Sequence, residues 1–163
     1  MTPPRVNVGI SELEVARAPA TLGALGLGSC VAVILHDPHV KVGGIAHVLL
    51  PSASVGRRRD DLPARFAPVA VATLIERLKA MGASASRLTA RLVGGASMFS
   101  SLQTPGTIQM GERNVVAARE ALHRHRVRLT GELVGGDFGR SVEFDVESGR
   151  VKVTSYLHGT IEL

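Results

Sequence analysis

Residues 25–50 read LGLGSCVAVILHDPHVKVGGIAHVLL, and this stretch decides the fold. The run Val31–Leu35 is apolar and rich in β-branched residues, which is typical of a buried strand, and Asp37-Pro38 ends it at a turn. A second apolar run, interrupted by Gly43-Gly44, covers Val40–Leu50. Two strands joined by so short a turn predict a β-hairpin.

The rest of the chain adds two helices and several more strands. Apolar residues at helical spacing predict helices over Pro68–Met81 and Gly111–His125. Short apolar or alternating runs predict the remaining strands: Leu88–Val93, Val127–Val134, Ser141–Val146 and Val151–Tyr156, with a strand pair or a strand and turn inside Arg5–Arg17. The total is about six or seven strands. Because several pair through hairpins, at least part of the sheet is antiparallel, which disfavours a doubly wound parallel fold.

Length and composition favour one ordinary globular domain. The chain has 163 residues, of which 45% are hydrophobic and 20% charged, so residues 1–163 are expected to form a single domain. The longest apolar runs are too short to cross a bilayer, and the N-terminus has no secretory signal pattern. We therefore expect a cytoplasmic protein without membrane insertion.

The positive charge does not by itself predict a nucleic-acid partner. The formal net charge is +5, but aromatic residues make up only 3% of the chain. Proteins that bind single-stranded nucleic acid usually add aromatic stacking platforms to their basic groups. The densest basic run, Arg57–Arg59, is followed at once by Asp60-Asp61, as in a solvated loop. We expect no nucleic-acid partner.

Cys30 is the only cysteine, so it is a buried apolar filler, a metal ligand or a reactive thiol. A zinc site is disfavoured, because there is no second thiol and the six histidines form no HxxxH pair. Gly26 and Gly28 just before it permit a tight turn, which would put the thiol at the mouth of a strand beside free backbone N–H groups.

His47 stands out because it interrupts an apolar run seventeen residues after Cys30, on the other strand of the predicted hairpin. A buried histidine is costly unless it is hydrogen-bonded or used in chemistry. A thiol needs a base to become an effective nucleophile at neutral pH. The pair is therefore either a Cys30–His47 catalytic dyad, with a thiol that alkylates faster than a free one, or an inert thiol beside a satisfied core histidine.

Four separate stretches resemble one known family, in order and with family-like spacing: LGSCVAVILHDPHVKVGGIAHVLLP, RLTARLVGGASMF, MGERNV and GGDFGRSVEFDVESGRV. Together they resemble the chemoreceptor glutamine deamidases (CheD proteins) from about Leu25 to about Val153. The resemblance implies a mixed, largely antiparallel α/β sandwich flanked by helices, similar to the catalytic domain of cytotoxic necrotizing factors.

The resemblance also implies a function. The family hydrolyses glutamine side chains of methyl-accepting chemotaxis receptors to glutamate, and its members bind the CheC-type chemotaxis phosphatase. Its catalytic cysteine and histidine fall on Cys30 and His47, which would act as nucleophile and base through a thioester. We expect no organic cofactor, no metal and a monomer.

One position departs from the family pattern. The family usually has threonine six residues before the cysteine as the third catalytic member, and Ala24 occupies that place here. Thr21, three residues earlier, would reach the site only through an irregular loop between Pro19 and Gly28. Otherwise a group such as a backbone carbonyl would orient His47, or activity would be reduced. The alternative function is therefore a weakly active or inactive regulator that binds the CheC-type phosphatase.

Overall fold

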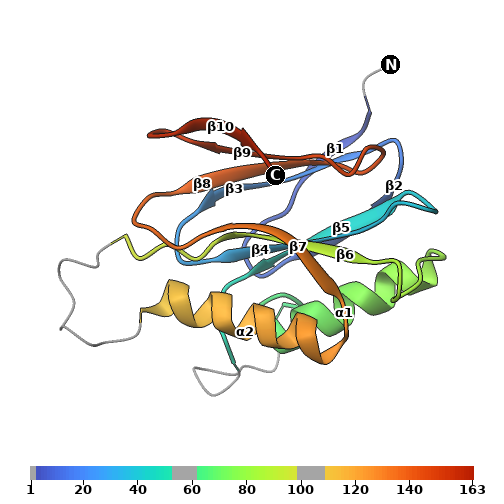
Figure 1. Ribbon diagram of the computed structural model, residues 1–163, viewed down its shortest axis with the longest axis horizontal. Helices are drawn as coiled ribbons and strands as arrows, with labels where there is room; N and C mark the ends of the chain where they lie inside the picture. Colours follow the sequence, from blue (N-terminus) through green and yellow to red (C-terminus); the bar gives the residue numbers. More distant parts are fainter. Residues whose placement is uncertain (1–2, 53–61, 99–108) are drawn as a thin grey trace.

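The structure, a computed structural model, describes residues 3–52, 62–98 and 109–163. Its elements form three layers: an outer sheet, an inner sheet, and two helices that cover the far face of the inner sheet (Figure 1). The outer sheet has the order β1-β3-β8-β9-β10 and the inner sheet the order β2-β5-β4-β6-β7. The predicted mixed α/β sandwich is confirmed, but both helices lie on one side of it. The likeness to cytotoxic necrotizing factors stays a prediction.

The predicted hairpin forms the centre of the inner sheet. Strands β4 (Val31–Asp37) and β5 (Val42–Val48) pair antiparallel, with Val31 opposite Val48 and Asp37 opposite Val42. Every residue of both strands is buried. The other strands of this sheet are β2 (Leu13–Arg17), β6 (Thr89–Gly94) and β7 (Arg128–Val134). β6 pairs with β7 in parallel and with β4 antiparallel.

Gly43 and Gly44 do not break strand β5 but let the neighbouring layers come close. They point to opposite faces, as successive strand residues do. A Cβ on Gly43 would lie 2.6 Å from the Phe144 ring of the outer sheet, and one on Gly44 would lie 2.7 Å from Leu74 of helix α1 (Ala67–Ala80). The pair therefore sets the spacing of all three layers.

The outer sheet departs most from the sequence-based prediction. It contains β1 (Arg5–Asn7), β3 (Thr21–Leu27), β8 (Arg140–Asp145), β9 (Val151–Ser155) and β10 (Gly159–Glu162). The count of six or seven strands was too low, because the described residues alone form ten. β1, β3 and β10 carry glycine or polar residues and obtain their strand geometry from pairing with neighbours, a tertiary effect that local patterns do not contain.

Helix α1 and helix α2 (Met110–Arg124) confirm the two predicted helices to within a residue at each end. Their apolar faces pack on the inner sheet and form one hydrophobic core, whereas a second core fills the space between the two sheets. No helix among residues 3–52, 62–98 and 109–163 is both long and apolar enough to cross a membrane. The basic run Arg57–Arg59 lies outside the described residues.

Candidate active site

Cys30 stands at the exit of a tight turn between β3 and β4. The N–H of Ala96 donates to the carbonyl oxygen of Gly28 at 2.8 Å. The N–H of Gly95 donates to the carbonyl oxygen of Cys30, also at 2.8 Å. Gly94 has φ of 114°, and a side chain there would collide with that same carbonyl oxygen. The loop after β6 therefore requires glycine and fixes the cysteine backbone from one side.

His47 and Cys30 face the same space between the two sheets. Ala32 is the residue directly opposite His47 in the β4–β5 ladder. Cys30 comes two residues before Ala32, so its side chain leaves the same face of the sheet and lies diagonally across from His47. Such diagonal neighbours are separated by about 7–8 Å between backbones, which side chains can span. Both residues are buried, with exposed fractions of 7% and 2%.

A backbone carbonyl fixes the tautomer of His47. Its Nδ1 lies 2.9 Å from the carbonyl oxygen of Val8. A carbonyl can only accept, so Nδ1 carries the proton and Nε2 keeps a free lone pair. Nε2 is buried and has no hydrogen-bond partner among the described residues. The imidazole is thus held in the form that can take a proton at Nε2.

The residues before β2 wrap around His47 and hold its backbone as well. The His47 N–H donates to the carbonyl oxygen of Glu12, and the Ser11 N–H donates to the carbonyl oxygen of His47, both at 2.9 Å. Val8 also donates its own N–H to Gly23 of β3 at 2.7 Å. A single peptide segment therefore connects the outer sheet to the histidine.

Burial keeps both members of the pair neutral at rest. It raises the pKa of the Cys30 thiol above its ordinary value, against a smaller lowering by the N–H of Cys30 itself. It lowers the pKa of the His47 imidazole, against smaller raising effects of the Val8 carbonyl and of Glu12. Both directions favour a neutral thiol beside a neutral imidazole. The fast-alkylating thiol expected from the sequence stays a prediction, and burial argues against it.

Thr21 does not join this pair. Pro19–Gly28 is not an irregular loop, because strand β3 starts at Thr21 and pairs with β8. Leu22 and Ala24 point inward to the core between the sheets, so Thr21 points outward. There it lines a hollow of about 290 Å³ with four charged residues and one serine of β8, β9 and the turn between them: Glu143, Asp145, Ser148, Arg150 and Lys152. The position that faces the site is Ala24, which is fully buried.

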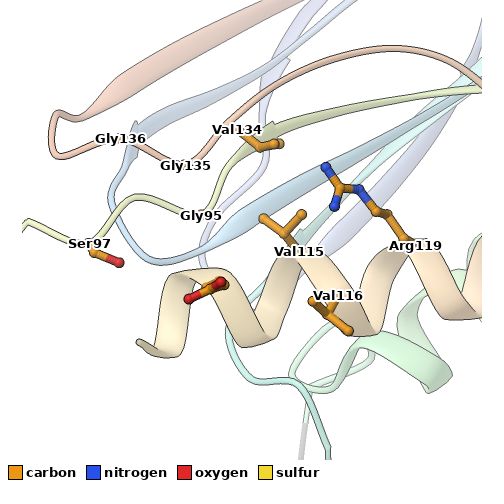
Figure 2. Close-up of a pocket in the computed structure, with 9 residues that line it drawn as sticks. Gly95, Ser97, Val115, Val116, Arg119, Val134, Gly135 and Gly136 are labelled. Atoms are coloured by element: carbon orange, nitrogen blue, oxygen red, sulfur yellow. The ribbon is translucent and has the colours of Figure 1, made fainter. Parts of the chain in front are cut away.

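Two hollows lie near the turn of Cys30. One of about 210 Å³ adjoins it and is lined by Ser29, Ala96, Ser97, Met98, Gln109, Met110 and Gly111. A second, of about 360 Å³, lies between helix α2, which carries Val115, Val116 and Arg119, and the loops that hold Gly95 and Gly135 (Figure 2). Neither Cys30 nor His47 lines either hollow. The first hollow lies next to the thiol along the chain, because Ser29 directly precedes Cys30.

Sequence reasoning found the cysteine and the histidine but missed the groups that hold them. Val8 acts through its carbonyl, which leaves no trace in residue type. Asn114, buried in helix α2, was noticed only as part of the stretch MGERNV. An asparagine on the apolar face of the predicted helix, four residues before Ala118, is a sequence signal that could have found it. Among the described residues, no group of three or more His, Cys, Asp or Glu could hold a metal ion.

Comparison with known proteins supports the resemblance. The sequence model described as "CheD chemotactic sensory transduction" matches residues 49–155. A probable chemoreceptor glutamine deamidase CheD of Desulforamulus reducens is 43% identical over 91% of this chain and 89% of its own. The chemoreceptor glutamine deamidase CheD of Thermotoga maritima is 44% identical over 90% of this chain and 88% of its own.

A further relative has the same kind of name, the probable chemoreceptor glutamine deamidase CheD 2 of Geobacter metallireducens. It is 45% identical over 91% of each chain. Among solved structures, a Neisseria meningitidis protein covers 83% of this chain and 63% of its own, with a TM-score of 0.46 and 12% identity.

Proposed function

This chain belongs to the CheD family, and from that premise we propose that it hydrolyses glutamine side-chain amides of chemotaxis receptors to glutamate. Cys30 is the nucleophile and His47 the general base. The relatives' names support the substrate class, and the geometry around the two residues supports the roles proposed for them. No cofactor takes part in this scheme.

The reaction begins from the neutral pair. As the glutamine side chain enters beside Ser29, the Cys30 thiol gives its proton to Nε2 of His47, and the sulfur attacks the amide carbon. The carbonyl oxygen becomes an oxyanion. In this proposal the N–H of Cys30, whose interaction with the sulfur lowers the pKa of the thiol, donates to this oxyanion.

The intermediate then breaks down in two steps. The imidazolium returns its proton to the amide nitrogen, the carbon–nitrogen bond breaks, and ammonia leaves a thioester on Cys30. His47 next takes a proton from water, whose oxygen attacks the thioester carbon. The carbon–sulfur bond breaks, glutamate is released, and the thiolate recovers the proton from His47.

The observation that carries this proposal is the free Nε2 of His47. It is buried and unpartnered among the described residues, on the same sheet face as the chain's only cysteine. A core histidine that served only packing would be expected to use both ring nitrogens, because a buried polar atom without a partner costs about 1–3 kcal/mol. A proton transfer from the thiol gives this nitrogen a use.

The test is ammonia release from a receptor fragment that contains the receptor's glutamine sites. The native chain should release ammonia and convert individual glutamines to glutamate, seen by mass spectrometry of peptides. Cys30→Ala should release none, and Val69→Ala, a comparably small change at an exposed position of helix α1, should keep the activity. Equal ammonia release by the native chain and Cys30→Ala would refute the assignment.

The same experiment decides the alternative function. Ala24 removes the hydroxyl that the family pattern usually supplies, which favours a regulator that binds a CheC-type phosphatase with little catalysis. If the native chain binds such a phosphatase but releases no ammonia from receptors, the regulator is the better description. The backbone carbonyl of Val8 favours the enzyme, because it orients His47 without that hydroxyl.

A further inference from the structure

Asn114 connects the ends of the two strands next to Cys30 and His47. It lies on the inner face of helix α2, fully buried, and its Nδ2 donates two hydrogen bonds. One goes to the carbonyl oxygen of Ser29 at 2.9 Å and the other to the carbonyl oxygen of Leu49 at 3.0 Å. Ser29 directly precedes Cys30, and Leu49 follows His47 by two residues.

The location of these bonds matters because the sheet provides none there. The last pair of the β4–β5 ladder is Val31 with Val48. Beyond it, the β4–β5 ladder has no further pair. The amide group of Asn114 bonds to both strands just past this end, at Ser29 and at Leu49.

Only a side chain with two hydrogens on one nitrogen and this length fits. The carbonyl oxygens can only accept, so an aspartate of equal size would put charge against both of them. Gly111, one turn before, packs so closely on the Gly95 and Ala96 backbone that a side chain would not fit there. That contact holds helix α2 at the distance from which Asn114 reaches both strands.

We propose that Asn114 is a positioning residue for deamidation, which fixes the separation of Cys30 and His47; this inference rests on the proposed function. It does not line the hollow beside Ser29, so it acts through the two strand ends and not through substrate. Losing it should therefore slow the chemical step and leave substrate affinity unchanged. It should also open the turn and let water reach the thiol.

The test compares Asn114→Asp and Asn114→Leu with the native chain. For both, we expect kcat to fall at least tenfold with KM within twofold. We also expect iodoacetamide to alkylate Cys30 faster at pH 7, with the midpoint of the rate–pH profile moved down toward that of a free thiol. A purely structural asparagine would not make the thiol more accessible while the enzyme became slower.

Leu122→Ala is the matched control, because Leu122 is buried on the same helix and its apolar side chain cannot hydrogen-bond to either strand end. It should lower the melting temperature while kcat and the alkylation profile stay near native. The proposal is overturned if Leu122→Ala reproduces both changes at equal loss of melting temperature, or if Asn114→Asp keeps native kcat and alkylation. If the native chain releases no ammonia, the proposed function fails instead, and the alkylation profile alone decides whether Asn114 positions Cys30.

Discussion

At the scale of single residues, the two buried histidines differ in which ring nitrogen is hydrogen-bonded. His47 uses Nδ1 for the Val8 carbonyl and leaves Nε2 free, whereas His36 uses Nε2 for the carbonyl of Val146 at 2.8 Å. Both histidines are buried in the same sheet. They are therefore a natural pair of positions for testing which buried imidazole takes part in deamidation.

Replacing His47 by asparagine should abolish measurable deamidation while the protein stays folded. Asparagine can keep the donor to Val8 but has no basic nitrogen, so the loss should be roughly a hundredfold or more in kcat. Ammonia release measures it, and circular dichroism checks the fold. His36→Gln, which keeps the donor to Val146, is the control and should retain activity within twofold. Survival of activity in His47→Asn would mean that His47 is not the base.

Thr21→Ala should leave kcat within twofold of native. The hydroxyl lies on the outer face of the outer sheet, on the side away from Cys30 and His47, and the Val8 carbonyl already orients the imidazole. The assay is again ammonia release from a receptor fragment. A tenfold loss of kcat would mean that Thr21 takes part in the reaction, which would require β3 to rearrange when substrate binds.

The thiol itself should be slow in the resting protein. Because burial raises the pKa of Cys30, iodoacetamide should react at pH 7 more slowly than with a free thiol, and the rate should keep rising above the ordinary thiol range. The chain has one cysteine, so total label reports on this site alone. The unfolded chain in urea is the control. Faster labelling than in urea at pH 7 would point to an ion pair.

At the scale of elements, strand β5 shows what the sequence could and could not predict. The hairpin, both helices and the β8–β9 hairpin follow from local apolar patterns, and the structure confirms them. Cys30 and His47 were found because each residue type is unusual in its place. The outer strands and the Val8 carbonyl could not be found, because pairing and chain path are set by contacts distant in sequence.

Gly43→Ala should destabilise the fold, because its methyl group would meet the Phe144 ring and the carbonyl oxygen of Leu35 at 2.9 Å. Overpacking of this kind costs about 1–3 kcal/mol, measured as a lower midpoint of urea unfolding. Gly139→Ala is the control, because its added methyl would meet only the Leu27 carbonyl oxygen at 3.7 Å. If the two variants unfold alike, Gly43 does not set the sheet spacing.

At the scale of the whole molecule, the core between the two sheets gives the stability of the fold a dependence on pH. Burial lowers the pKa of both His36 and His47, so the folded protein binds fewer protons than the unfolded chain just below the ordinary histidine value. The stability they contribute is present above that value and is lost as pH falls. Each histidine can remove up to about 1.4 kcal/mol per pH unit in that window.

Urea unfolding at pH 7, 6 and 5 should therefore give a free energy of unfolding that decreases toward pH 5. His36→Gln and His47→Asn should each flatten part of the slope, because neither substitute titrates in this range. Stopping at pH 5 keeps most carboxylates ionised in both states. A free energy that stays constant or rises toward pH 5 would contradict the burial of neutral histidines.

The hydrogen bond from His47 to Val8 has a genetic consequence. Its acceptor belongs to the main chain, so any residue that preserves the local path supplies it equally well, and no codon change at position 8 deletes the oxygen. A saturation-mutagenesis screen for loss of deamidation should identify Cys30 and His47 but should not identify Val8. Selection at this place acts on the backbone path of Val8–Glu12, so the residue types there can change as long as that path is kept.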